Sequence, residues 1–195
     1  MVPIIDNKRY HFGPRGLYDG LVLLGDDETH SYWNHITGEC VYGSMKGEKM
    51  HVFPIHQLSV ERALAKWPDL QIALSRPPLI MRFLAPIMNR GKRKAFLPPG
   101  FRKTMATVDN RLPEMTSGLG VIIDNQQRFY PIERIKHTGG TINDQLNGRT
   151  LTVMIHQEDQ TPYALDDDDK RPMQLFTRWY GFYLTYPHCS VFEEK

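Results

Sequence analysis

The sequence has few of the residues and motifs that indicate a particular chemical function. Only two cysteines, Cys40 and Cys189, occur in 195 residues, which is too few for a disulfide scaffold, and they form no C-x-x-C pair. No apolar run approaches the roughly 20 residues that a membrane helix needs, and the N-terminus lacks the residue order of a signal peptide. We expect free, partly buried thiols and no transmembrane segment. The compartment is not defined by the sequence, and it is the cytoplasm if Met1 is the true start.

Catalytic and metal-binding motifs are also missing. There is no glycine-rich phosphate loop, no G-x-S-x-G elbow and no paired-carboxylate spacing. The eight histidines include two pairs five residues apart, but none has the H-x-x-x-H spacing or the neighbouring cysteines of a zinc site. We therefore expect no metal and no cofactor, and the sequence leaves open whether the chain is an enzyme.

Acidic residues are absent from one long stretch. Residues 76–103 contain eight Lys or Arg and no Asp or Glu, although the whole chain has a net charge of only +2. An apolar segment there, 79–88, precedes a basic cluster of Arg90, Lys92, Arg93 and Lys94. The stretch is either a surface loop with one amphipathic turn or a contact for a protein partner or an acidic surface. We expect no nucleic acid, because no binding motif occurs and aromatic residues are not interleaved with the charge.

What the sequence does contain is a series of short strand signals. In the N-terminal part, glycines at positions 13, 16 and 20 predict a loop before a strand at 21–24. Strands at 31–33 and 40–42 complete a predicted three-stranded antiparallel meander. A further strand is expected at 50–53, where Pro54 ends it. Ser59 is the predicted cap of a helix over 59–66, and a short strand follows at 71–74.

The C-terminal part repeats this mixture. Strands at 119–123 and 127–130 are joined by a tight turn at Asp124-Asn125, and a short helix is expected at 132–136. Asn147-Gly148 predicts a hairpin before the β-branched strand 150–155. Residues 166–170 form an acidic, solvated loop, and the aromatic stretch 176–192 predicts a helix followed by a strand.

A short sequence pattern that occurs twice suggests a duplicated unit. Trp67-Pro68 and Tyr186-Pro187 each follow a helical segment and precede a β-branched residue, 119 positions apart. We therefore predict an α+β, β-rich fold of antiparallel strands with short helices, made of two related units in one compact domain. The first unit is 1–75, the C-terminal part of a repeat. A connecting excursion covers 76–110, and the second unit is 111–195.

Six segments carry a family resemblance: FGPRGLYDG at 12–20, SYWNHITGECVYG at 31–43, LPPGFRKTM at 97–105, RLPEMTSGLGV at 111–121, RFYPI at 128–132 and TYPHCSVF at 185–192. With these the chain resembles DUF3179, a bacterial family of unknown function, and in particular its selenoprotein branch. The resemblance implies a thiol or selenol redox protein. In that branch a Cys-x-x-Cys or selenocysteine-x-x-Cys loop precedes the segment found here at 12–20, so the chain looks like a form that lacks this N-terminal part. If a selenocysteine codon had been taken for a stop, Met1 would be a false start.

Five polar or aromatic residues of the N-terminal meander are the candidate pocket residues: Arg15, Tyr18, Trp33, His35 and Glu39. If the family's redox loop precedes the meander, Arg15 or His35 could lower the pKa of a thiol or selenol by positive charge, while Glu39 orients His35. The alternative is that Trp33 lies in the core, His35 bonds to a carbonyl group and Glu39 lies on the surface. No catalytic residue is predicted within the chain.

Two functions stay open. By resemblance, the chain is a portion of a redox protein whose reactive motif is absent from it. Alternatively, it is a non-catalytic module that binds a partner protein or a small ligand.

Overall fold

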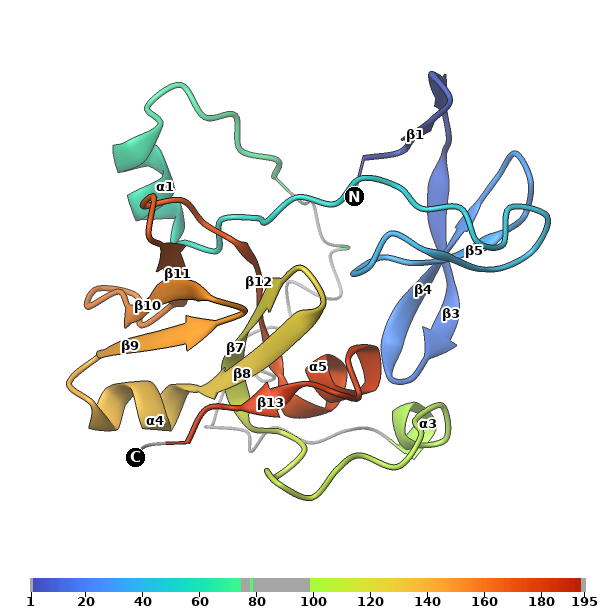
Figure 1. Cartoon of the computed structure of the whole chain (residues 1–195). Helices are drawn as coiled ribbons and strands as arrows, with labels where there is room; N and C mark the ends of the chain where they lie inside the picture. The colour runs from blue at the N-terminus through green and yellow to red at the C-terminus, as the bar shows by residue number, and fades with distance from the viewer. Residues whose placement is uncertain (1, 75–77, 79–98, 194–195) are drawn as a thin grey trace. The chain divides into compact units, whose positions relative to one another are not determined.

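The computed structural model describes residues 2–74, 78 and 99–193 (Figure 1). The predicted basic cluster at 90–94 lies outside these residues. The chain divides into two compact units, one formed by Met1–Gln57 with Pro98–Lys195 and the other by Leu58–Leu97. The predicted fold class is confirmed, because antiparallel sheets dominate and the helices are short. No helix among the described residues is long and apolar enough to cross a membrane.

The N-terminal part of the larger unit is a four-stranded sheet with strand order β3-β4-β5-β6. Its strands are β3 (Phe12–Tyr18), β4 (Leu21–Asp26), β5 (Tyr32–Asn34) and β6 (Cys40–Tyr42), and the small hairpin of β1 (Ile4–Ile5) and β2 (Lys8–Arg9) precedes it. The predicted meander is confirmed. The prediction of a glycine-rich loop before the meander is wrong, because Gly13 and Gly16 lie within the strand β3. Asp19 and Gly20 both have positive φ, so they make a two-residue hairpin turn of the Asp-Gly kind.

Two strands expected from the sequence are not formed. Lys49 pairs with Glu39 only as an isolated bridge, and residues 51–59 continue without regular pairing. Residues 71–74 likewise have no strand partner among the described residues. Both stretches have the apolar composition of strands, but a strand requires a neighbour to accept and donate its backbone hydrogen bonds.

The C-terminal part of the larger unit contains two more sheets. One has the order β12-β7-β8-β13 and the other the order β11-β10-β9. The strands are β7 (Ser117–Ile123), β8 (Gln126–Pro131), β9 (Thr141–Leu146), β10 (Arg149–Ile155), β11 (Pro162–Asp166), β12 (Met173–Arg178) and β13 (Ser190–Val191). β13 pairs with β8 in parallel, and the other pairs are antiparallel. The sequence missed β11, gave no bounds for β9 although the predicted hairpin at Asn147-Gly148 requires a strand there, and extended the final helix backwards into β12.

Short helices follow the strands. In the larger unit these are α3 (Pro99–Arg102), α4 (Ile132–His137) and α5 (Trp179–Thr185). In the smaller unit α1 (Val60–Lys66) starts at Ser59, whose side chain accepts a hydrogen bond from the Arg62 backbone N–H, as predicted.

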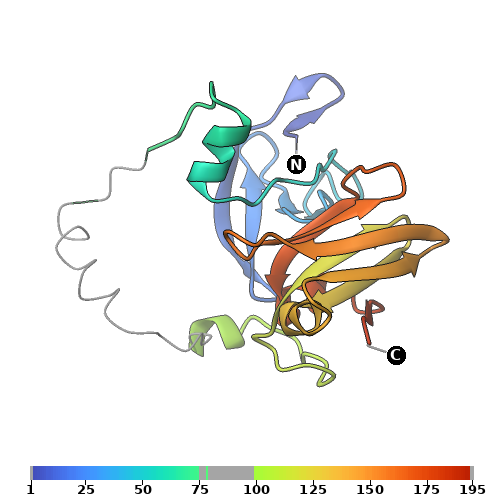
Figure 2. The same ribbon diagram turned by 90° about the vertical axis from the view of Figure 1, so that its left-hand side faces the viewer.

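The hairpin β7–β8 organises the core, because successive side chains of a strand point to opposite faces. On one face Leu119, Val121 and Tyr130 pack with residues of β9, β10 and β11. On the other face Phe129 packs with Trp179 and Phe182 of α5. The ribbon of α5 runs beside this hairpin in Figures 1 and 2. α5 approaches closely because position 120 is glycine. A Cβ atom there would lie 2.0 Å from the Phe182 ring.

Candidate functional site

Of the five candidate pocket residues, Trp33 lies in the core. It is fully buried, and its indole Nε1 donates a hydrogen bond of 2.8 Å to Asp26 Oδ2. Asp26 is also fully buried and accepts hydrogen bonds from Thr29 and Ser31. Burial alone would raise the pKa of this carboxyl group, but the hydrogen bonds from Trp33, Thr29 and Ser31 outweigh burial and hold the pKa below its usual value. This cluster therefore fixes the turn between β4 and β5.

Three more candidates lie on the surface. Arg15 forms an ion pair of 2.5 Å with Asp27, and Glu39 forms one of 3.5 Å with Lys49. Tyr18, at the end of β3, is 57% exposed. These three side chains do not share a cavity with His35. Exposed ion pairs of this kind contribute little to stability.

His35 lines a cavity that the described residues form. Its Nδ1 lies 2.8 Å from the carbonyl oxygen of Val22. A carbonyl group can only accept a hydrogen bond, so Nδ1 carries the proton, and in the neutral ring Nε2 is a hydrogen-bond acceptor. The strand β4, rather than Glu39, thus sets the orientation of the ring.

The cavity that His35 lines has a volume of about 560 Å³ and is mostly apolar. We call it the β4–β12 cavity. Its walls come from β3 and β4, from the extended residues 51–57 and from β12, and its apolar side chains include Phe12, Leu21, Leu24, Val52, Phe53, Ile55, Leu175 and Phe176. The sequence reasoning missed these residues, since they come from three segments far apart in the chain. The only available signal was the apolar character of Val52 and Phe53.

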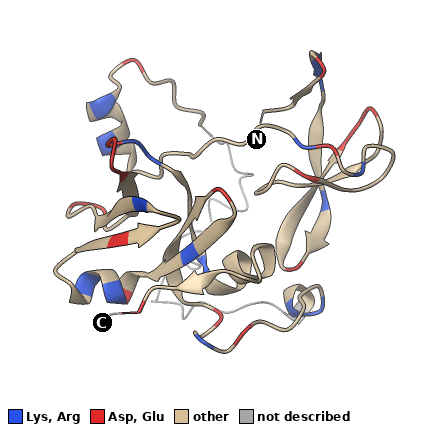
Figure 3. Ribbon diagram, in the orientation of Figure 1, with Lys and Arg blue, Asp and Glu red and all other residues tan. Residues whose placement is uncertain are grey.

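Few polar groups face the β4–β12 cavity. Gln174 lies in its wall, but the side chain of Gln174 is buried and bonds to the backbone of Ala164 through both its oxygen and its nitrogen. His35, Gln57 and Thr177 are the other polar residues that line it. Figure 3 shows that many charged residues of the described chain lie in turns and on helices α1 and α4. A cavity of this size with apolar walls and a few polar groups is typical of a small-molecule site.

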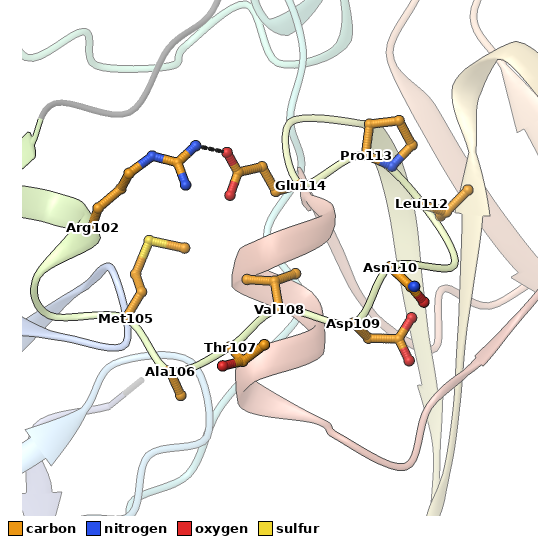
Figure 4. Close-up of a pocket in the computed structure, with 10 residues that line it drawn as sticks. All are labelled: Arg102, Met105, Ala106, Thr107, Val108, Asp109, Asn110, Leu112, Pro113 and Glu114. Carbon is orange, nitrogen blue, oxygen red and sulfur yellow. Dashed lines mark hydrogen bonds and ion pairs between the residues drawn. The ribbon is translucent and has the colours of Figure 1, made fainter.

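A second cavity, of about 630 Å³, is built by the single loop 102–114. Figure 4 shows Arg102 and Glu114 extending toward each other at one end of it, where they form an ion pair. Asp109 pairs with Arg111, whose guanidinium group lies over the Trp179 ring. Four charged side chains of this loop are thus paired within it, and Arg111 also contacts α5.

A third cavity, of about 760 Å³, is more polar than the β4–β12 cavity and lies beside β8, β9 and β13. Arg128 donates hydrogen bonds to Asp144 at 2.5 Å and to Ser190 at 2.9 Å, and the Tyr130 hydroxyl also donates to Asp144. Burial raises the pKa of the Tyr130 phenol, and the Asp144 charge raises it further. The network joins three strands of two sheets, which is a sufficient structural role for these residues.

Both cysteine thiols lie in buried surroundings. Cys40 and Cys189 are 4% and 2% exposed, and both are free. Burial raises the pKa of Cys189 to about 11, against the opposing effect of Arg111, and burial also raises the pKa of Cys40. The thiolate is the reactive form of cysteine. Neither residue therefore has the exposed, low-pKa environment of a redox centre.

The comparisons place the chain in a family. Within the described residues, no three His, Cys, Asp or Glu side chains gather as metal ligands would. The sheets and the β4–β12 cavity make the larger unit a β-rich domain with an apolar cavity. Residues 3–181 match the family model described as protein of unknown function (DUF3179). The chain belongs to this family. No curated protein and no solved structure matches it.

Proposed function

We propose that the chain is a non-catalytic binding module whose β4–β12 cavity takes a small, mostly apolar ligand that carries one hydrogen-bond donor. The observation that carries the proposal is the composition of the cavity, whose mostly apolar lining includes His35, with Nδ1 of that ring bonded to the Val22 carbonyl oxygen. An apolar ligand gains free energy from the surface that it buries. A hydroxyl or N–H group on the ligand would bond to His35 Nε2, which selects for such ligands.

A pair of probes tests the proposal. 1-Naphthol has an apolar ring system and one hydroxyl group, whereas 1-methylnaphthalene has a similar shape without a donor. We expect the chain to bind 1-naphthol more tightly in a calorimetric titration. His35→Phe should weaken 1-naphthol binding about fivefold, since a neutral hydrogen bond contributes roughly 1 kcal/mol, and should leave 1-methylnaphthalene binding unchanged.

Two further variants control this experiment. His137→Phe changes an exposed histidine at the end of α4 and should bind both probes like the unmodified chain. Val52→Trp places a large ring inside the cavity and should weaken binding of both probes. Absence of probe binding by the unmodified chain, or binding that Val52→Trp leaves intact, would refute the proposal.

The redox role implied by the family resemblance is a separate proposal. It concerns a longer form with a Cys-x-x-Cys or selenocysteine-x-x-Cys loop, because the two thiols of this chain are buried and have raised pKa values. In this proposal the 195-residue chain does not reduce a disulfide dye, whereas the longer form does. Equal inactivity of both forms would favour the binding module.

A further inference from the structure

The third cavity, beside β8, β9 and β13, keeps polar groups that its own hydrogen-bond network does not use. Arg128 lines this cavity and donates from Nε to Ser190 Oγ at 2.9 Å. Its Nη1 donates to Asp144 Oδ2 at 2.5 Å and to Gln145 O at 3.2 Å. Nη2 has no acceptor among the described residues. The guanidinium group is therefore fixed in place and still has donors for a ligand.

The β9–β10 hairpin adds three more polar side chains to the lining, those of Asn143, Gln145 and Thr150. Gln145 and Thr150 lie opposite each other in the strand register, so their side chains are neighbours on one face of the sheet. Both are exposed, and neither side chain has a hydrogen-bond partner within the described chain. Asn143 accepts a bond from Thr152 through Oδ1, which leaves its Nδ2 as a donor. This part of the cavity thus offers amide and hydroxyl groups that both donate and accept.

The charges around the third cavity favour a neutral ligand. Arg128 is paired with Asp144, so its positive charge is already compensated. Glu193 adds a carboxylate to the lining, and an anionic ligand would be repelled by it. A cationic ligand gains little from Glu193, because this residue is exposed and ion pairs in water are weak.

The β13 side of the same cavity is apolar. Val191 and Phe192 line it there. The Phe192 ring is stacked on the Tyr130 ring, with 5.6 Å between the ring centroids, so its orientation is fixed by the core. A ligand for this cavity must therefore combine several hydroxyl groups with an apolar face.

We propose that the third cavity is a binding site for a neutral carbohydrate. Each sugar hydroxyl group can donate to Gln145 or Thr150 and accept from Arg128 or Asn143. The C–H groups on one face of a sugar ring gain free energy when they cover apolar surface such as Val191 and Phe192. The volume of about 760 Å³ falls within the range of small-molecule sites.

Saturation-transfer NMR of the full chain with methyl glycosides tests the proposal. The probes are methyl β-glucoside, methyl β-galactoside and methyl α-mannoside, and we expect at least one of them to bind with a Kd of about 1 mM or less. Methyl β-glucuronide, which carries a carboxylate in place of a hydroxymethyl group, should bind more weakly than the glucoside. The proposal is overturned if no glycoside binds at about ten times that concentration, or if the glucuronide binds more tightly than the glucoside.

Variants of the hairpin locate the binding. Thr150→Val and Gln145→Leu keep the approximate shape of each side chain and remove its polar groups, so each should weaken glycoside binding about fivefold. Thr141→Val is the matched control, because Thr141 is an exposed threonine of β9 that does not line the third cavity, and its affinity should be unchanged. All of these positions are exposed, and urea unfolding checks that the variants fold. Unchanged binding by both Thr150→Val and Gln145→Leu also overturns the proposal.

This experiment is independent of the ligand proposed for the β4–β12 cavity. The two cavities share no lining residue among those described. Thr150→Val and Gln145→Leu should therefore bind 1-naphthol like the unmodified chain, and loss of naphthol binding in these variants would contradict the separation of the two sites.

Discussion

The buried carboxylate of Asp26 gives a prediction whose size follows from the structure. Asp26→Ala removes the acceptor of Trp33 Nε1 at 2.8 Å and of Ser31 N at 3.2 Å, and both of these residues are fully buried. A buried donor that loses its partner costs roughly 1–3 kcal/mol, so the two together predict a loss of about 4 kcal/mol in the free energy of unfolding. Thr29 is only partly buried, and its donors can bond to water instead.

Urea unfolding followed by tryptophan fluorescence measures this loss. Asp167→Ala is the matched control, because Asp167 lies exposed in the acidic turn, and its effect should stay within about 0.5 kcal/mol. A loss below about 1 kcal/mol for Asp26→Ala, or one equal to the control, would refute the structural role of the carboxylate.

The same residue predicts a pH dependence. The pKa of Asp26 is lowered in the folded chain, so its stabilising contribution is complete above the unfolded value of about 3.9 and is lost as the pH falls through the folded value. Acidification from about pH 6 to about pH 3 should therefore destabilise the unmodified chain more than Asp26→Ala. Equal acid sensitivity of the two proteins contradicts the lowered pKa.

Three further predictions concern the core and the thiols. Gly120→Ala should cost about 1–3 kcal/mol because its Cβ atom would overlap Phe182, whereas Gly100→Ala, which meets no atom within 4 Å, should be close to neutral in the same unfolding assay. Asp144→Ala leaves Arg128 and Tyr130 without their shared acceptor, and a loss of about 2–3 kcal/mol is expected, less than for a fully buried pair because the Arg128 side chain is 25% exposed. At about pH 8 the folded chain should react slowly with a thiol reagent, and both cysteines should react at once in denaturant, because burial suppresses the thiolate; rapid reaction of the folded chain contradicts this.

The sequence predicted those elements that local patterns define. The helix after Ser59 and the hairpins at Asp124-Asn125 and Asn147-Gly148 depend on a cap or on turn residues, and the structure has them. β3 was missed because its glycines were taken for a loop, although Asp19-Gly20 is itself a hairpin signal. The strand expected at 50–53 fails for a non-local reason, since apolar composition cannot provide a neighbouring strand.

The candidate site was less predictable than the fold. His35 lies next to a predicted strand, and its polar side chain could be chosen from the sequence. The walls of the β4–β12 cavity could not be chosen in this way, because Leu24 and Leu175 are separated by most of the chain and meet only through the tertiary structure. Arg15, Glu39 and Tyr18 were grouped with His35 because they are close to it in the sequence. In the folded chain their side chains lie on the surface instead, since successive side chains of a strand point to opposite faces.

The parallel pairing of β13 with β8 has a consequence for how the chain folds. Val191 meets Phe129 across 62 intervening steps of the chain, and β12 reaches β7 over a similar separation. Contacts between such distant segments form slowly, since a long loop must close before they stabilise anything. Until they form, a β7–β8 hairpin has two uncovered apolar faces and two open edges, and open edges and uncovered apolar faces favour aggregation of an incompletely folded chain.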